Sequence, residues 1–111
     1  MTTETIQNEI SAKIAELNDA ARSNAANYMA TQGIIALDEV AISEAFVGVQ
    51  QFDSFTEDND PYGEHDFGSF KVAGEKVFWK IDYYKQDLSG WCDSLDPDCR
   101  RVITVMLAEE Y

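Results

Sequence analysis

The chain has 111 residues and a formal net charge of −13. Its hydrophobic fraction of 45% and its six Phe, five Tyr and two Trp predict one folded globular domain over residues 1–111 rather than an acidic disordered tail. No apolar run approaches the roughly 20 residues that span a bilayer, and the first residues show no secretory signal. We therefore expect a cytoplasmic protein whose charge repels nucleic acid and membrane surfaces and attracts basic partners.

Apolar residues recur at steps of three and four near the start of the chain, at Ile6, Ile10, Ile14, Leu17 and Ala21. This spacing predicts an amphipathic helix over residues 4–22, whose apolar stripe packs on the core or forms the seam of a homodimer. Residues 27–31 are predicted to form a short strand. A second helix is expected over residues 38–51, with Asp38 as its N-cap.

A long acidic loop is expected over residues 53–66. Within it, Asp60-Pro61-Tyr62-Gly63 has the residue order of a β-turn. A hairpin follows, with one strand over residues 67–72, a turn at 73–75 and a second strand over 76–84.

The final segment, residues 101–108, is rich in β-branched residues on both parities, which favours a strand covered on both faces. The predicted fold class is α+β, with two helices packed on a small, mostly antiparallel sheet of about four strands. Residues 4–22 would be the N-terminal helix and residues 26–111 the α+β core.

The negative charge is unevenly spread. Between Arg22 and Lys71 the sequence has no Lys or Arg, whereas its acidic residues there carry a charge of −9: Asp38, Glu39, Glu44, Asp53, Glu57, Asp58, Asp60, Glu64 and Asp66. Such carboxylates can take the place of phosphates and meet Arg and Lys in bidentate contacts. The predicted partner-binding surface consists of Asp53, Glu57, Asp58, Asp60, Glu64 and Asp66, with Tyr62 as an aromatic anchor.

Alternation along residues 76–84 separates two faces of the strand. One face, expected to be core, carries Val77, Trp79, Ile81 and Tyr83; the other carries Phe78, Lys80, Asp82 and Tyr84.

If the acidic loop folded over the second face, Glu64, His65 and Asp66 would meet Lys80, Asp82 and Tyr84. That cluster could carry out acid–base chemistry or hold a ligand or a divalent metal. The plainer interpretation is a surface ion pair between Lys80 and Asp82, and a His65 that stabilises a turn. No cofactor is predicted.

Cys92 and Cys99 are the only cysteines. Two thiols in a cytosolic chain are usually reduced. A loop-closing disulfide and a shared metal remain open alternatives, because the spacing is not diagnostic.

Several segments resemble a family of small bacterial domains of unknown function, frequent in alphaproteobacteria and on plasmids and phage-like elements. The resemblance runs from about Ile14 onward and rests on these motifs: Leu17-Asn18-Asp19-Ala20, Gly33-Ile34, Phe52-Asp53-Ser54-Phe55, the block from Asn59 to Gly68, the block from Phe78 to Tyr84, and the block from Arg101 to Tyr111. It implies no established activity and no catalytic residues. Cys92 and Cys99 depart from the family pattern.

Members of that family accompany genes that blunt host defence, such as anti-restriction functions. Together with the charge, this resemblance leads us to expect a non-enzymatic inhibitor, anti-CRISPR or anti-restriction in kind. It would dock its acidic surface on the basic groove of a nucleic-acid-handling complex, without binding nucleic acid or membrane itself. The alternative is a small enzyme or ligand-binding domain that uses Glu64, His65, Asp66, Lys80, Asp82 and Tyr84.

Overall fold

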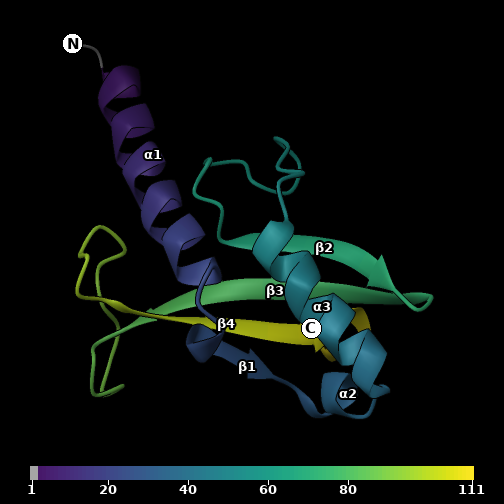
Figure 1. Cartoon of the computed structure of the whole chain (residues 1–111). Helices are drawn as coiled ribbons and strands as arrows, with labels where there is room; N and C mark the ends of the chain where they lie inside the picture. The colour runs from purple at the N-terminus through teal and green to yellow at the C-terminus, as the bar shows by residue number, and fades with distance from the viewer. Residues whose placement is uncertain (1–2) are drawn as a thin grey trace.

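The computed structural model describes residues 3–111. Its main elements, in chain order, are α1 (Thr3–Arg22), β1 (Tyr28–Ala30), α2 (Gln32–Ile35), α3 (Glu39–Gln51), β2 (Phe67–Val72), β3 (Glu75–Tyr84) and β4 (Arg100–Leu107) (Figure 1). Single turns of 3-10 helix precede β1 at η1 (Ala25–Asn27) and follow β4 at η2 (Ala108–Glu110). The predicted α+β class is confirmed, and the short helix α2 is an addition to the two expected helices.

The four strands form one sheet in the order β1-β4-β3-β2. β2 pairs with β3 and β3 with β4 in antiparallel orientation, whereas β1 runs parallel to β4. The sheet is therefore mixed, and the expectation of a mostly antiparallel sheet holds for all strands but β1. β4, the last strand in sequence, lies inside the sheet between β1 and β3.

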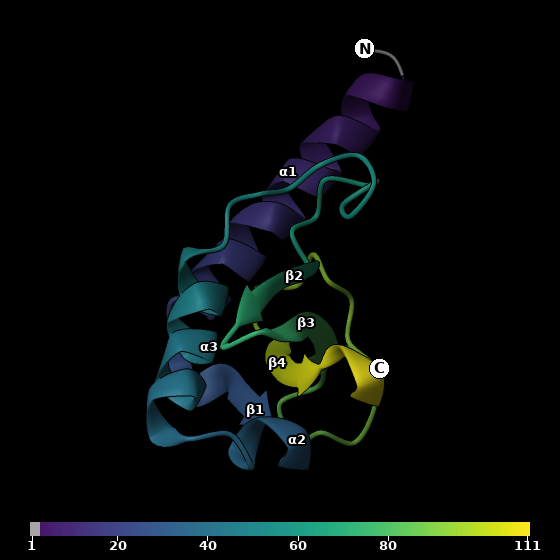
Figure 2. The same ribbon diagram turned by 90° about the vertical axis from the view of Figure 1, so that its right-hand side faces the viewer.

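The hydrophobic core lies between the sheet and the helices. α1 and α3 lie on one side of the sheet, and α2 lies near its β1 edge (Figure 2). The predicted inward face of β3 is confirmed, because Val77 and Trp79 are fully buried and Ile81 nearly so. These side chains pack in one cluster with residues of β4, α2 and α3: Ile103, Val105, Ile34, Ala41, Ala45 and Val49.

Local chemistry explains the boundaries of α3 and of the hairpin. Asp38 caps α3, because its carboxylate accepts a hydrogen bond from the Ala41 N–H at 2.8 Å. The hairpin turn has Ala73 at φ 51° and Gly74 at φ 82°, the two left-handed positions that match the twist of a tight hairpin. The Asp38 cap is thus confirmed. The hairpin is confirmed with a shorter turn than expected, because Glu75 already belongs to β3 and pairs with Val72.

The α1 stripe is only partly buried. Ile14 lies in the core, whereas Ile6 keeps 46% of its surface exposed, and the N-terminal part of α1 extends beyond the sheet (Figure 1). The expectation that the whole stripe packs on this domain is therefore wrong for Ile6. None of the helices within residues 3–111 has the length and hydropathy that a membrane crossing requires.

The face of the sheet opposite α1 and α3 carries Phe78, Lys80, Asp82 and Tyr84, and we call it the open face. On β4, Val102 and Thr104 are half-exposed there, while Met106 is buried. The expectation that β4 is covered on both faces is thus met for only part of its length. Tyr111, at the end of the chain, packs on the rings of Phe67 and Phe78.

Candidate functional site

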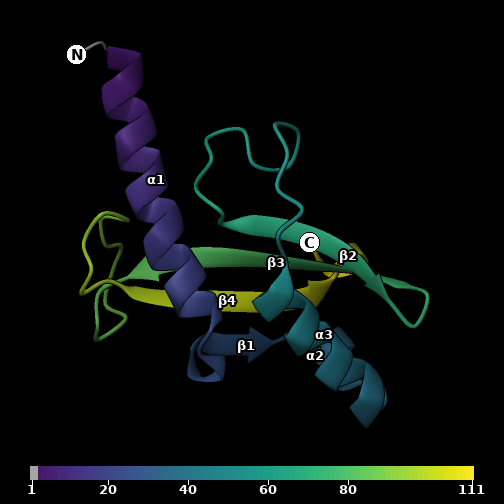
Figure 3. The same cartoon turned by 45° about the horizontal axis from the view of Figure 1, so that its top comes forward.

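Residues 53–66 form the connection from α3 to β2, and we call this segment the acidic loop. It rises above the β2 edge of the sheet toward α1 (Figure 3). Asp60 holds its shape from inside. The carboxylate is buried and accepts hydrogen bonds from the N–H groups of Glu64 at 3.0 Å and His65 at 3.2 Å. The Asp60 carbonyl accepts from the Gly63 N–H at 3.1 Å, so the predicted turn is present.

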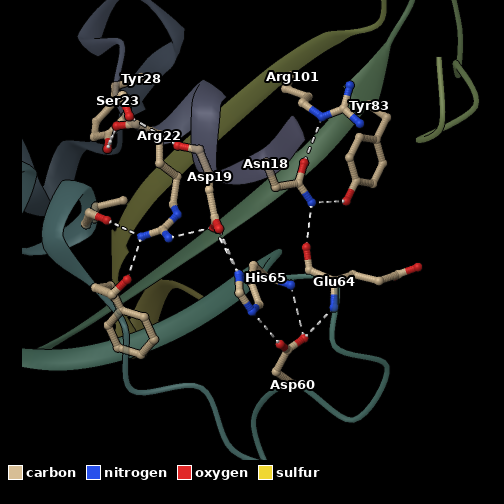
Figure 4. Close-up of polar contacts among 12 residues, drawn as sticks. Asn18, Asp19, Arg22, Ser23, Tyr28, Asp60, Glu64, His65, Tyr83 and Arg101 are labelled. Atoms are coloured by element: carbon tan, nitrogen blue, oxygen red, sulfur yellow. Dashed lines mark hydrogen bonds and ion pairs between the residues drawn. The ribbon is translucent and has the colours of Figure 1, made fainter. Parts of the chain in front are cut away.

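His65 joins the loop to α1. Its backbone is left-handed, with φ 58°, and its ring stacks on Phe55 at 3.9 Å between centroids and an interplanar angle of 1°. Nδ1 lies 3.0 Å from Oδ1 of Asp19, and Nε2 lies 3.8 Å from Oδ2 of Asp60 (Figure 4). Both ring nitrogens therefore face carboxylates of this chain, and the ring serves as an internal tie between two segments.

Arg22 extends this contact to α3. The side chain is buried, and its guanidinium donates to the carbonyls of Val49 at 2.7 Å and Phe52 at 2.9 Å, at the end of α3. It also donates to Asp19 at 2.9 Å (Figure 4) and lies over the ring of Trp79, 5.0 Å from the centroid. A cation at a helix C-terminus satisfies carbonyls that have no partner within the helix. Asp19 thus pairs with a buried cation on one side and with His65 on the other.

Asn18 forms a second connection to the loop. The side chain is fully buried, and its amide donates to the Glu64 carbonyl and to the Tyr83 hydroxyl, both at 2.9 Å. Its carbonyl oxygen accepts from Nε of Arg101 at 2.7 Å (Figure 4). Burial raises the pKa of Tyr83 to about 12, so the phenol stays protonated in this network. Asn18, Tyr83 and Arg101 therefore fix where the loop enters β2.

The loop also ties itself together near its start. The Asn59 side chain accepts from the Thr56 N–H at 2.8 Å and donates to the Ser54 carbonyl at 3.0 Å. The Asp60 N–H donates to the Thr56 carbonyl at 2.8 Å. Because these bonds and the contacts with α1 act on one short segment, the loop has a defined conformation in spite of its length.

The predicted partner-binding residues fall into two groups. Asp53, Glu57 and Asp58 are exposed and make no ion pair or side-chain hydrogen bond within the described part of the chain. On the same loop, 74% of the Tyr62 surface is exposed. Asp60 faces inward and is an anchor. Glu64 and Asp66 are half-buried, and burial, followed by the neighbouring carboxylates, raises the pKa of each.

Four of the eight Lys and Arg residues of the chain project from the open face of the sheet. By strand register, Lys80 lies opposite Thr104, Lys71 opposite Lys76, and Arg100 opposite Tyr84. Each side chain at these register positions projects from the open face, because paired residues share a face. The lysines of the sheet therefore do not neutralise the acidic loop, which packs on the helix side.

The cluster suggested by the sequence is divided between the two faces. Lys80 forms an ion pair with Asp82 on the open face, whereas His65 packs on Phe55 and Asp19 on the helix side. The loop folds toward α1, so His65 and the Lys80–Asp82 pair lie on different sides of the sheet. Of the loop residues, Asp66 is near enough to Asp82 for that carboxylate to raise its pKa, after the larger effects of burial and Asp60. Lys80, Asp82 and Tyr84 line a hollow of about 320 Å³ together with neighbours from β1, the β3–β4 connection and β4: Met29, Leu88, Val102 and Thr104.

Within residues 3–111, no group of three or more His, Cys, Asp or Glu side chains is placed to coordinate a metal ion.

Sequence reasoning missed the residues that hold the loop, namely Asn18, Asp19, Arg22 and Arg101. A signal was present, because Asn18 and Arg22 lie four residues apart, next to the apolar stripe at Ile14, Leu17 and Ala21. Polar side chains at that helical spacing share one side of the helix, and polar groups beside a core stripe need buried partners. The partners themselves lie too far along the chain to be identified from spacing.

Together, fold and contacts define a small α+β domain whose acidic loop is clamped to an N-terminal helix. Residues 30–110 match the sequence pattern of a family described as a protein of unknown function, DUF3768. The chain belongs to this family. The match begins at Ala30, the last residue of β1, and covers α2, α3, the acidic loop and strands β2 to β4, whereas α1 lies before it. The chain matches no curated protein and no solved structure.

Proposed function

We propose that this protein is a non-enzymatic binding protein that docks the acidic loop on a basic protein surface. One observation carries the proposal. Asp53, Glu57 and Asp58 are exposed and unpaired within residues 3–111, and they share with the exposed Tyr62 a loop that internal contacts hold in place. Binding by an ordered loop costs less conformational entropy than binding by a mobile one.

A loop with these carboxylates is complementary to a protein surface that binds phosphate groups. Carboxylates accept bidentate hydrogen bonds from Arg as phosphates do, and an exposed Tyr is a common anchor of protein interfaces. We therefore infer that the partner has a basic groove that binds nucleic acid, as the target of an anti-CRISPR or anti-restriction inhibitor would. The protein would occupy that groove in place of nucleic acid.

The test compares three forms of the full chain in pull-downs from bacterial lysate at low and high salt. The loop variant carries Asp53→Asn, Glu57→Gln and Asp58→Asn. The matched control carries Glu9→Gln, Glu75→Gln and Glu109→Gln, which are also exposed and change the net charge equally. We expect the wild type and the control to retain a nucleic-acid-handling protein at low salt, and the loop variant to lose it.

A purified partner then allows a direct competition. Added DNA should displace the protein, and binding should weaken by about tenfold or more between low and high salt, as expected when several charge contacts form. Equal retention of the loop variant and the wild type, or binding that is indifferent to salt and to DNA, would reject the proposal.

The hollow on the open face supports a second candidate function, the binding of a small ligand. Met29, Leu88 and Val102 supply apolar walls, and Lys80 supplies a cation near them. Asp82, which is paired with Lys80, also lines the hollow, so this lining suits a molecule with an apolar body and one anionic group that replaces Asp82 as the partner of Lys80. Anilinonaphthalene sulfonate is a suitable probe, and its fluorescence should rise with the wild type and with Lys13→Gln but not with Lys80→Gln. No enhancement with the wild type would exclude this candidate.

A further inference from the structure

The segment between β3 and β4, residues 85–99, brings the two cysteines to the same strand end. Trp91 bridges to Tyr84, and the Cys92 N–H donates to the Tyr83 carbonyl at 3.3 Å. The Cys99 thiol lies 3.5 Å from the Tyr84 carbonyl. The two cysteines thus contact consecutive carbonyls of β3. Both also contact Asp96, since Sγ of Cys92 lies 3.9 Å from Oδ2 of Asp96 and the Cys99 N–H donates to the Asp96 carbonyl at 3.1 Å.

The segment between them is folded without any help from a covalent link. The Asp96 N–H donates to the Asp93 carbonyl at 2.9 Å, and the Cys99 N–H donates to the Asp96 carbonyl at 3.1 Å. The Arg101 guanidinium donates to the carbonyls of Ser94 and Asp96. These contacts fold residues 92–99 back on themselves, so that both cysteines lie at the same end of β3.

We propose that Cys92 and Cys99 are a redox pair that closes residues 92–99 into a ring by an intramolecular disulfide. Both cysteines are free thiols in this structure. The oxidant is a low-molecular-weight disulfide such as glutathione disulfide.

The reaction proceeds by two thiol–disulfide exchanges. Cys92 is half-buried and Cys99 buried, so Cys92 is the thiol that a small disulfide reaches. Its thiolate attacks one sulfur of glutathione disulfide and releases one glutathione thiolate. The Cys99 thiolate then attacks Sγ of Cys92 in the mixed disulfide and releases the second. In total, two protein thiols and one glutathione disulfide give one protein disulfide and two molecules of glutathione.

The surroundings of Cys99 determine how fast the ring closes. Burial, followed by the neighbouring Cys92 thiol, raises the pKa of the Cys99 thiol to about 12, while Arg101 acts in the opposite direction and Asp96 in the same direction. The thiolate fraction of Cys99 is therefore small at neutral pH, and ring closure should accelerate as the pH rises.

The ring would reinforce the network that anchors the acidic loop. Arg101, held by carbonyls inside the ring, donates to Asn18, and Asn18 donates to the Glu64 carbonyl. The ring would also fix the backbone beside Trp91, whose surface is 71% exposed. A cross-link removes conformations from the unfolded chain, so the oxidised form should melt at a higher temperature than the reduced form.

The test uses the full chain, incubated with glutathione disulfide in excess over glutathione and then alkylated. Cleavage after Lys85 and Arg100 leaves both cysteines in one peptide. We expect this peptide to resist alkylation and to be lighter than its reduced form by two hydrogens. Cys99→Ser should stop at a mixed disulfide on Cys92, and Cys92→Ser should react much more slowly.

The result with the wild type decides the proposal, so it does not depend on whether the variants fold. Two thiols that remain open to alkylation, a wild-type mixed disulfide that persists with glutathione, or a disulfide between two chains would each overturn it. An internal link within the peptide of residues 86–100 supports it.

Discussion

The imidazole of His65 lies against the carboxylate of Asp19, with Nδ1 3.0 Å from Oδ1, although 46 residues separate the two in the chain. The same carboxylate oxygen accepts a hydrogen bond from Arg22 at 2.9 Å. One side chain of α1 thus holds both the acidic loop and the buried cation at the end of α3. The position of the loop depends on this pair of contacts.

Replacing Asp19 by Asn should loosen the loop. Arg22 is buried and would lose its carboxylate, and His65 would lose its charged partner. We expect Asp19→Asn to lower the free energy of unfolding by about 1–3 kcal/mol, measured by urea denaturation followed by circular dichroism. An endoproteinase that cleaves after Glu should also cut the loop at Glu57 faster.

Glu16→Gln is the control for that change. Glu16 lies on the same helix, and its ion pair with Lys13 at 3.7 Å is exposed, so the loss should stay within about 0.5 kcal/mol. Equal destabilisation by both substitutions would show that the Asp19 contacts do not anchor the loop.

Asn18→Ala should be among the more damaging changes in α1. It leaves the Glu64 carbonyl, the Tyr83 hydroxyl and the Arg101 Nε–H without their partner. Buried polar groups that lose their hydrogen bonds are costly, and we expect a loss of about 2–4 kcal/mol in the free energy of unfolding. Asn8→Ala, at an exposed position of the same helix, should change it little. A small effect of Asn18→Ala would mean that water replaces the amide.

Gly68 in β2 permits the close packing of Trp79 and Phe52. A Cβ at this position would lie 2.5 Å from Nε1 of Trp79 and 2.8 Å from Cε1 of Phe52. Because both rings belong to the core, we expect Gly68→Ala to lower the free energy of unfolding by about 1–3 kcal/mol. Thermal unfolding followed by tryptophan fluorescence would measure it. Gly90→Ala is the matched control, since a Cβ there meets no atom within 4 Å, and comparable losses at the two sites would contradict the packing argument.

Asp66 should make stability depend on pH. Burial raises the pKa of its carboxyl, and Asp60 and Asp82 act in the same direction. A carboxyl whose pKa is higher in the folded state than in the unfolded state binds its proton more readily when folded. Its contribution is therefore fully present below the unfolded pKa and is lost as the pH rises through the folded pKa. We expect Asp66→Asn to gain stability over the wild type at pH 7 compared with pH 4.

Urea denaturation of both proteins from pH 4 to pH 8 would show this difference, since the other titrating groups are common to the two chains. A difference between variant and wild type that stays constant over this range would contradict the assigned cause.

Local chemistry by itself determined much of this protein. The Asp38 cap and the apolar spacing predict α3, and the Ala73–Gly74 step predicts the hairpin. Strict alternation along β3 identifies Val77 and Trp79 as core. Each of these features depends on residues a few positions apart, where backbone geometry and side-chain period fix the outcome.

Only the tertiary structure decided which side of the sheet the acidic loop covers. Alternation shows which side chains share a face but does not show what packs on that face. The loop packs on α1 through the contacts of Asp60, His65 and Arg22. Polar groups that leave water need partners, and the partners of these groups lie far along the chain. The sequence therefore predicted the charge of the loop, whereas the long-range contacts determined which of its carboxylates remain free to bind another molecule.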